Sequence, residues 1–589
     1  MAFIATLAAV ALVLPVFVEV WRTTRFFDTD DAMRLVQVRD LLAGQGWFDL
    51  VAHRLNPPDA VLSHWSRVID VPLAGMILFF SLFTSREIAE TLTRLTFPLL
   101  VQFAYFAALF TLFRRMAGPR ALIAGFFLAV LCSSTNLQFL PGRIDHHAPQ
   151  ILLLVLMALM SVRCLAAQSS RAAMLLGCLI ALSMAISIEN LPFIVAILAV
   201  FSFGWIFAHE PTQRALRPLG AALAVASILA FAGTVPPARY LDPVADAFGI
   251  GHLAVLVATG LLFVACSVLT PHLRGGNARL ALVLAAGLAL VAALAAWCPY
   301  LLHDPLSGVD PLVRSTWLSR VREARPLWLL VVRAPVENIY HVGPLLLGIA
   351  AIAWAIRASS GAARWQWIAL AALALAGALA AAWQVRALTS VLPIVLVGGA
   401  WAVVQAIRRF ETQAMPWAVV KPACVAVLFC VQIWQGVAQS AAQALPVHAE
   451  MTPDESAAAD TCFDASSYVP LRALPATKVL APIDLGPFVL VYTPHAVVAA
   501  PYHRNNAGNR LFIETMLASP GNARALAEKS RAQVLAFCPF AREITLYYAK
   551  LAPDGLAAAL LRGQPPAWLS RIDGQASGQA SPIQLYVIR

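Results

Sequence analysis

Two adjacent carboxylates, Asp30 and Asp31, follow the first apolar run of the chain. Neighbouring acids at the edge of an apolar region are costly unless a cation or a substrate compensates their charge. The pair therefore predicts either a cation site or an acid–base site. A structural alternative is that Thr29 or Asp30 caps a helix that runs to Leu42, with the acids in its first turn.

A second candidate site lies in the sequence Asp145-His146-His147, just before another apolar segment. A carboxylate and an imidazole two residues apart, Asp145 and His147, suit Mn²⁺ or a similar divalent ion. The structural alternative is again a helix cap, with the histidines merely at the membrane interface.

A third segment is unusually rich in arginine around one carboxylate, Glu323. Its basic residues are Arg314, Arg320, Arg322, Arg325 and Arg333. Arginine is well suited to phosphate, so the cluster favours a retained anion. A solvated loop in which Glu323 pairs with arginine is the alternative.

Two more ionisable residues, Glu189 and Arg386, stand at the ends of apolar runs. An ionisable side chain within the membrane is energetically costly, so we expect such a residue to have a function. The alternative for both is an interfacial side chain that snorkels to water.

The elements that must position these residues are membrane helices. The chain of 589 residues is 60% hydrophobic and 12% charged, whereas soluble domains are about 25% charged. Runs of about 20 apolar residues span a bilayer. The predicted spans, about thirteen, are 2–20, 93–113, 121–138, 149–166, 172–188, 192–208, 216–233, 251–270, 278–298, 342–357, 365–383, 389–407 and 416–436. The short stretch Val68–Phe83 is predicted to lie flat at the interface.

Basic residues in the connecting loops predict the orientation. With the N-terminus in the cytoplasm, the cytoplasmic loops and helix ends contain Arg114, Arg115, Arg120, Arg163, Arg171, Arg214, Arg217, Arg274, Arg279, Arg357, Arg364, Arg408 and Arg409. The net charge of +11 is spread over these loops, which argues against a nucleic-acid partner. An odd number of spans places the C-terminal part outside.

The chain thus divides into a transmembrane domain, 1–437, with outer loops 22–92 and 299–341, and an extracytoplasmic domain, 438–589. Expected strands in the second domain are Lys478–Ala481, Phe488–Tyr492, Ala496–Ala500, Gln533–Phe537, Ile544–Tyr548 and Ile583–Ile588, with a helical stretch at Asn509–Ser530. These elements predict a mixed α/β fold. Its two cysteines, Cys462 and Cys538, predict a disulfide.

In order and layout, these segments resemble the catalytic subunit of oligosaccharyltransferase and its bacterial single-chain form, which are GT-C glycosyltransferases. Asp30 precedes Arg39-Asp40 by nine residues, as the catalytic aspartate of that family does. Asp145-His146-His147 opens the fourth predicted span, where the family has Asp-x-Asp/Glu. The matching later motifs are Glu323-Ala324-Arg325-Pro326, Arg386 with Pro393, and Ile483-Asp484-Leu485-Gly486.

This resemblance implies transfer of a sugar or oligosaccharide from a polyprenyl-phosphate or polyprenyl-diphosphate donor at the periplasmic face of a bacterial inner membrane. It implies a membrane-embedded lipid donor and a divalent metal, Mn or Mg. Together with the residue chemistry above, the expected roles are catalysis by Asp30, Asp31, Asp145 and Glu323; metal binding by Asp30, Asp145 and His147; donor-phosphate binding by Arg386, Arg325 and Arg322; and acceptor or substrate binding by Glu189, Asp484, His503 and Arg504. For the segment with His503 and Arg504, a structural loop of the small domain is the alternative.

One departure from the family bears on the acceptor. The family reads an Asn-x-Ser/Thr sequon with two tryptophans, where this chain has Pro482-Ile483. The expected acceptor is therefore a glycan, a lipid or a protein without a sequon. A metal-free mechanism, a transporter or flippase for lipid-linked saccharides, and a non-catalytic subunit of a polysaccharide assembly complex are the alternatives.

Overall fold

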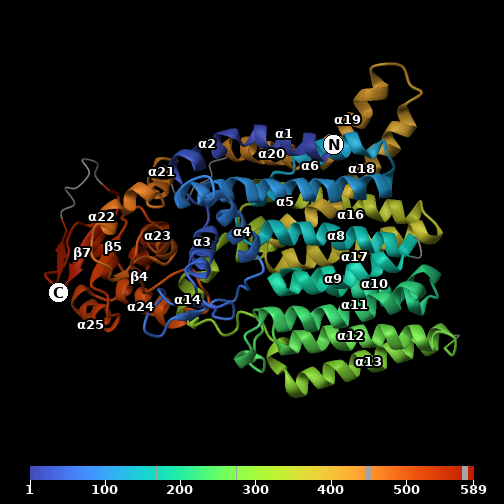
Figure 1. Ribbon diagram of the computed structural model, residues 1–589. Coiled ribbons are helices and arrows are strands. Elements are labelled where there is room, and N and C mark those ends of the chain that lie inside the picture. Colours follow the sequence, from blue (N-terminus) through green and yellow to red (C-terminus); the bar gives the residue numbers. More distant parts are fainter. Residues whose placement is uncertain (167–168, 274, 445–452, 573–580) are drawn as a thin grey trace.

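The computed structural model describes residues 1–166, 169–273, 275–444, 453–572 and 581–589. Its helices form a bundle, and the C-terminal domain packs against one end of that bundle (Figure 1). The predicted class, a polytopic helical protein with a mixed α/β domain at its C-terminus, is confirmed.

Nine helices among the described residues are long and apolar enough to cross a membrane. They are α5 (Arg86–Ala117), α8 (His147–Ala166), α10 (Leu191–Ile206, with the preceding turn), α11 (Glu210–Thr234), α12 (Ile250–Leu269), α13 (Gly276–Trp297), α16 (Pro335–Arg357), α17 (Gly361–Trp383) and α18 (Ala387–Phe410). A shorter apolar helix, α9 (Ser170–Ile186), lies between α8 and α11 (Figure 1).

Three further predicted spans are bent pairs of helices. Their bounds and bends are α1 (Ala2–Leu12) with α2 (Leu14–Thr23), 66°; α6 (Ala121–Val130) with α7 (Ser133–Asn136) and the next turn, 60°; and α19 (Trp417–Phe429) with α20 (Val431–Ala444), 70°. Each of the thirteen predicted spans therefore falls on a long helix, on α9 or on a bent pair.

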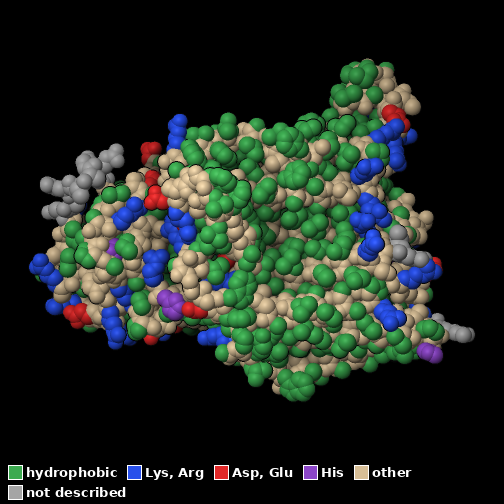
Figure 2. Space-filling model, viewed as in Figure 1, with side chains coloured by type: hydrophobic (Ala, Val, Ile, Leu, Met, Phe, Trp, Pro, Cys, Tyr) green, Lys and Arg blue, Asp and Glu red, His purple; other side chains and the backbone are tan. Residues whose placement is uncertain are grey.

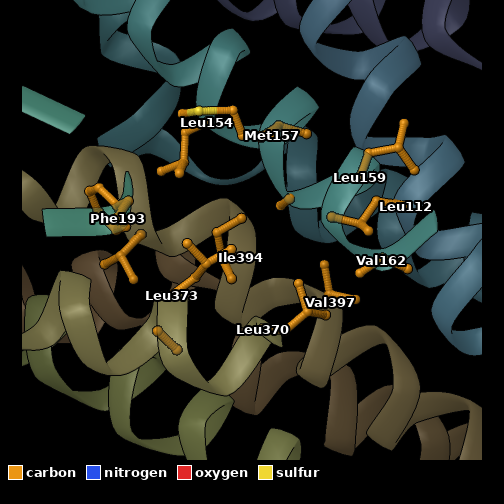
Figure 3. Packing of buried hydrophobic residues seen from close by; sticks show 14 of the residues in the cluster. Leu112, Leu154, Met157, Leu159, Val162, Phe193, Leu370, Leu373, Ile394 and Val397 are labelled. Atoms are coloured by element: carbon orange, nitrogen blue, oxygen red, sulfur yellow. The ribbon is translucent and has the colours of Figure 1, made fainter. Parts of the chain in front are cut away.

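The centre of the bundle is a dry apolar core. Figure 3 shows side chains from α5, α8, α10, α17 and α18 that meet there, among them Leu112, Leu154, Met157, Phe193, Leu373 and Ile394. Lipid is as apolar as these side chains, so close packing rather than water exclusion must hold the helices together. The contact of α11 with α12 illustrates this, because a Cβ on Gly220 would lie 2.3 Å from the carbonyl oxygen of Gly260.

The segment between α2 and α5 forms a platform beside the bundle. It contains α3 (Thr29–Leu42), a hairpin of β1 (Val51–Ala52) with β2 (Val61–Leu62), and α4 (Asp70–Ser81). Helix α4 covers the apolar stretch expected at the interface and has 12 residues, too few to span a bilayer. A buried ion network joins α3 to α4, since Asp70 pairs with Arg34 at 2.8 Å and with Arg67 at 3.1 Å.

The C-terminal domain contains a five-stranded mixed sheet in the order β4-β3-β5-β7-β6. The strands are β3 (Lys478–Leu480), β4 (Ala496–Val497), β5 (Val534–Phe537), β6 (Leu569–Arg571) and β7 (Gln584–Ile588). Strand β3 pairs in parallel with β4 and β5, while β7 runs antiparallel to β5 and β6. The predicted helical stretch is present as α24 (Asn506–Leu517) and α25 (Pro520–Lys529).

Two strand predictions were wrong. Phe488–Tyr492 belongs to helix α23 (Gly486–Tyr492), and Ile544–Tyr548 belongs to a wide helical turn, Glu543–Tyr548. Both are short apolar runs, for which composition alone does not separate a strand from a buried helix. Strand β6 was not predicted. The predicted disulfide is present, with the Cα atoms of Cys462 and Cys538 6.3 Å apart.

Candidate functional site

A cavity of about 730 Å³ opens where the bundle meets the C-terminal domain. The bundle, the platform and the C-terminal domain all contribute side chains to its wall. The predicted residues that line it are Asp30, His147, Glu189, Arg322, Glu323, Arg386, Asp484 and His503. Residues that lie hundreds of positions apart in the sequence thus share one site.

Asp30 faces this cavity from the first turn of α3. The helix to Leu42 with acids in its first turn, set out as the structural alternative, is present. Its cap is Asp28 rather than Thr29 or Asp30, because the Asp28 carboxylate accepts the Asp30 N–H at 3.0 Å. The Asp30 carboxylate takes part in no hydrogen bond or ion pair with the residues that the structure describes. Burial, and then the charges of Asp28 and Glu323, raise its pKa well above the ordinary value. A partly desolvated carboxylate of this kind suits proton abstraction.

Asp31, the next residue, points away from the cavity into the protein. It is fully buried, and its Oδ1 accepts the backbone N–H of Ile144 at 2.7 Å and of Asp145 at 3.1 Å. Burial raises the pKa of this carboxyl to about 7, although Arg143 opposes the shift. This position fits an anchor for the 142–147 segment rather than the catalytic base that the resemblance implied.

Arg143 holds three carboxylates together at the edge of the cavity, where Asp28 lines the space and Asp31 and Asp145 are buried. Its guanidinium pairs with Asp28 at 2.7 Å, with Asp31 at 3.3 Å and with Asp145. We call Arg143, Asp28, Asp31 and Asp145 the acidic cluster. The sequence analysis gave Arg143 and Asp28 no role, although Arg143 stands two positions before Asp145.

Asp145 links this cluster to the cavity. Its Oδ1 accepts the backbone N–H of His147 at 2.9 Å, which caps the start of α8, and its Oδ2 lies 3.0 Å from Nδ1 of His147. Capping and site formation were set out as alternatives for this motif, and the same carboxylate makes both contacts. Asp145 itself is 1% exposed, so it acts on the cavity through His147.

Glu189 contacts three basic side chains that line the cavity. Its Oε1 lies 3.3 Å from Nε2 of His146, 3.6 Å from Nε2 of His147 and 3.1 Å from Nη1 of Arg386. The Arg386 side chain is 36% exposed to the cavity. A guanidinium with one carboxylate partner and an open face can bind a phosphate oxygen.

Glu323 reaches the same cavity from the 299–341 segment. The segment is tied to the start of α18 by two backbone hydrogen bonds, from the N–H of Val385 to Arg325 and from the N–H of Arg386 to Glu323. Glu323 and Arg386 are therefore held next to each other. Burial, and then the charge of Asp28, raise the pKa of the Glu323 carboxyl.

The two arginines beside Glu323 are placed differently. Arg322 lines the cavity. Arg325 turns away and donates to the backbone oxygens of Ser319 at 3.1 Å and Arg320 at 3.2 Å. Its side chain thus shapes the loop, which does not fit the phosphate contact that the resemblance implied.

The C-terminal domain presents Asp484 to the opposite wall. Nε1–H of Trp317 donates to the Asp484 carboxylate at 3.2 Å, and the N–H of Asp484 donates to the buried Glu543 at 2.9 Å. Burial raises the pKa of the Asp484 carboxyl. An indole and a carboxylate side by side offer an apolar face and a hydrogen-bond acceptor to a substrate.

His503 and Arg504 are held by a residue that the sequence analysis missed, Asp246, in the connection between α11 and α12. Arg504 donates to both of its carboxylate oxygens at 2.7 Å, and His503 also bonds to it. These bonds outweigh burial and hold the pKa of Asp246 well below its ordinary range. His503 lines the main cavity, whereas Arg504 lines a smaller neighbouring one. Arg504 therefore fastens the domain to the bundle.

Two groups of described side chains have ligand atoms close enough to hold a metal ion: Asp28 with Asp31 and Asp145, and His146 with His147 and Glu189. Arg143 already fills the first group. The second fits an ion, because Nδ1 of His146 and both ring nitrogens of His147 are buried and make no hydrogen bond. Of the predicted ligands, Asp145 and His147 fall in different groups and Asp30 falls in neither, although Asp30 lines the same cavity as His147.

Comparisons with known proteins match the fold but not the sequence. No family model matches the chain, and no match was found among curated proteins. Among solved structures, the archaeal oligosaccharyltransferase AglB from Archaeoglobus fulgidus, in complex with an inhibitory peptide and a dolichol-phosphate, is similar with a TM-score of 0.69. Identity is 15%, and the match covers 97% of this chain and 72% of AglB.

A structure of the Archaeoglobus fulgidus oligosaccharyltransferase in complex with Zn and sulfate matches with a TM-score of 0.63 and 14% identity, over 97% of this chain and 71% of the other. The form of that enzyme tethered to an acceptor peptide with an NVT sequon matches with a TM-score of 0.69 and 14% identity, over 100% of this chain and 73% of the other. The chain therefore has the GT-C fold of oligosaccharyltransferases, as its motifs predicted.

Proposed function

We propose that this chain is a membrane glycosyltransferase that transfers a sugar or oligosaccharide from a polyprenyl-phosphate or polyprenyl-diphosphate donor. The observation that carries the proposal is the cavity itself. Asp30, His147, Glu189, Glu323 and Arg386 come from five separate parts of an oligosaccharyltransferase-like fold and line one space.

In the proposed reaction, an acceptor hydroxyl or amide attacks the anomeric carbon of the donor sugar. A new bond forms to that carbon, and its bond to the phosphate oxygen breaks, with the electron pair leaving on the phosphate. Asp30 takes the acceptor proton, because its carboxylate faces the cavity without a partner. Arg386, assisted by Arg322, binds the leaving phosphate.

Glu323 and Glu189 orient the reactants around this centre. Glu323 is fixed beside Arg386 by the backbone bonds of its loop, so it can accept a hydrogen bond from the acceptor. A divalent ion, Mn²⁺ or Mg²⁺, would be held by His147 and Glu189 with His146. Bound there, it would add positive charge next to the phosphate. Of the other ligands that the sequence predicted, Asp30 lines the same cavity, whereas Asp145 is engaged by Arg143.

We infer that the acceptor is not a sequon peptide. Ile483 and Pro482 replace the family's aromatic pair before Asp484, and the aromatic partner of Asp484 is Trp317 from the 299–341 segment. Asp484 and His503 line the wall on which an acceptor would lie, and Arg504 stands behind them. A glycan, a lipid or a protein without a sequon fits this wall.

We further propose that the cavity faces the periplasm of a bacterial inner membrane and that the N-terminus is cytoplasmic. Figure 2 shows Lys and Arg gathered at the end of the bundle far from the C-terminal domain, with an apolar belt between. Basic residues favour the cytoplasmic side. The disulfide supports an oxidising compartment for the C-terminal domain. A cavity at one end of the bundle favours transfer over transport.

The test is transfer by the purified chain in nanodiscs, with fluorescent polyprenyl-linked sugars as donors and cell-envelope extracts as acceptors. Wild type should convert the donor, and Asp30→Ala should not. Donor that stays intact with every acceptor fraction would contradict the proposal. A labelled sequon peptide serves as a second acceptor, and its glycosylation would overturn the non-sequon inference alone.

A further inference from the structure

We propose that Arg143 is a built-in counter-cation: its guanidinium occupies the place among Asp28, Asp31 and Asp145 that a divalent ion would otherwise take. Arg143 then acts as a positioning residue for Asp145 and His147. The catalytic part of this inference rests on the proposed function, whereas the occupancy part does not.

The geometry is that of a cation shared by three anions. Each guanidinium nitrogen of Arg143 approaches a different carboxylate: Nη1 lies 2.7 Å from Asp28, Nε lies 3.3 Å from Asp31, and Nη2 contacts Asp145. Nη2 also donates to Oε1 of Gln138 at 3.0 Å. The planar fork of arginine can serve three partners in this way, and the point charge of lysine cannot.

The cluster requires a cation because of its burial. The side chains of Asp31 and Asp145 are 0% and 1% exposed, and the ligand atoms of the three carboxylates lie within 4.8 Å of one another. Like charges this close and this dry do not stay ionised together without compensation. The Arg143 side chain, 11% exposed, contacts all three carboxylates and supplies this compensation.

The remaining ligand atoms are already engaged. Oδ1 of Asp31 accepts two backbone N–H groups, and Oδ1 of Asp145 accepts the His147 N–H. The Oδ2 atoms of Asp28, Asp31 and Asp145 are those turned towards Arg143. A divalent ion could enter this cluster only by displacing the guanidinium.

This arrangement also sets the position of His147. Asp145, held from one side by Arg143, contacts Nδ1 of His147 with the same oxygen, so Nε2 is left towards Glu189. Arg143 therefore separates two sites. The acidic cluster carries its own cation, and the histidine side of the cavity remains open to a ligand.

The test counts Mn²⁺ ions bound per chain by electron paramagnetic resonance, using full-length protein in nanodiscs. Arg143→Gln should bind one more Mn²⁺ per chain than wild type, and adding Asp31→Asn should remove that gain. Arg120→Gln is the control, because it breaks an exposed 2.9 Å ion pair with Glu411 outside the site. Its Mn²⁺ count should equal that of wild type. An Arg143→Gln chain with the wild-type count would overturn the proposal.

Arg143→Lys covers the case in which the glutamine variant does not fold. Lysine keeps the charge but reaches fewer carboxylates. We therefore expect the Arg143→Lys chain to bind the extra Mn²⁺ ion at millimolar Mn²⁺ concentration, at which wild type does not bind it. Exclusion equal to wild type would contradict the need for the fork. For transfer, Arg143→Lys should lose at least about tenfold relative to Arg120→Gln, since a slight misplacement of the site is costly. If no chain transfers sugar, the proposed function fails, while the Mn²⁺ counts still decide this inference.

Discussion

Aspartates of the acidic cluster and aspartates that face the cavity carry the same carboxylate group in two different environments. Asp31, in the cluster, is fully buried and receives two backbone N–H groups and an arginine. Asp30, its neighbour in the chain, faces the cavity and has no such partner among the described residues. A helix turns about 100° per residue, so adjacent acids at its start face different surroundings.

This difference in environment indicates that one group of carboxylates stabilises the fold and the other is open to a ligand. A buried carboxylate that is held by backbone hydrogen bonds and an ion pair stabilises the position of the chain around it, and removing it leaves its partners unpaired. A carboxylate that lacks partners can bind a proton, a metal ion or a substrate. The cluster therefore holds the 142–147 segment, and the carboxylates that line the cavity remain accessible to a ligand.

The largest expected effect on stability comes from Asp31→Asn. Above pH 7, where this carboxyl with its pKa of about 7 is ionised, the change removes the charge that faces Arg143. It should then lower the free energy of unfolding by about 3–5 kcal/mol, the usual cost of breaking a buried pair. Expression and the thermal unfolding midpoint in detergent measure it. The matched control is Asp28→Asn, whose side chain is 28% exposed, and a smaller loss is expected there. Equal losses would mean that burial does not distinguish the two.

A moderate effect on transfer is expected from Arg386→Gln. Loss of one charge-assisted contact to phosphate should raise the donor KM by about 10- to 100-fold, equivalent to about 1.4–2.8 kcal/mol. The unfolding midpoint should hardly change, because this side chain is 36% exposed. Arg325→Gln is the control and should leave KM near wild type, since Arg325 bonds to its own loop. The reverse pattern would exchange the roles of the two arginines.

The smallest effect is a change in pH dependence from Glu543→Gln, which extends the comparison to a third buried carboxylate. Burial, and then the charge of Asp484, raise the pKa of Glu543 well above its ordinary value. The folded state thus binds this proton more tightly than the unfolded state. Its stabilisation is complete below the ordinary glutamate pKa of about 4.3 and is lost as pH rises through the raised value.

Wild type should therefore lose more thermal stability than Glu543→Gln between about pH 5 and pH 8, above the ordinary carboxyl range. Differential scanning fluorimetry of both proteins across this range gives the comparison. Glu528→Gln, at an exposed ion pair with Arg524, should follow the wild-type curve. Parallel curves for wild type and Glu543→Gln would show that Glu543 does not carry the shift.

Much of this architecture could be predicted from the sequence, because membrane spans need long apolar runs. The bent pairs were also predicted as spans, because the apolar composition continues across each bend, for example at Pro15 and at Cys132. The short elements of the C-terminal domain were harder. Phe488–Tyr492 has strand-like composition, but it starts after Gly486-Pro487, which opens helix α23.

The residues that line the cavity could be predicted more readily than the residues that hold them in place. Motif order gave Asp30, Glu323 and Arg386, and the structure brings them to one cavity. Asp246 could not be recognised, because nothing in its surroundings signals that it meets His503 and Arg504 across more than 250 positions. Which of two adjacent acids faces the cavity also depends on the tertiary position of α3, which no local pattern specifies.

The most direct test of the division between cluster and cavity measures transfer and unfolding side by side for Asp30→Asn and Asp31→Asn. We expect Asp30→Asn to lose transfer by about 10²–10⁴-fold, the usual contribution of a general base, with the wild-type unfolding midpoint. Asp31→Asn should lose stability, and its folded fraction should keep measurable transfer. Full activity in folded Asp30→Asn, or a complete loss in folded Asp31→Asn, would contradict the account.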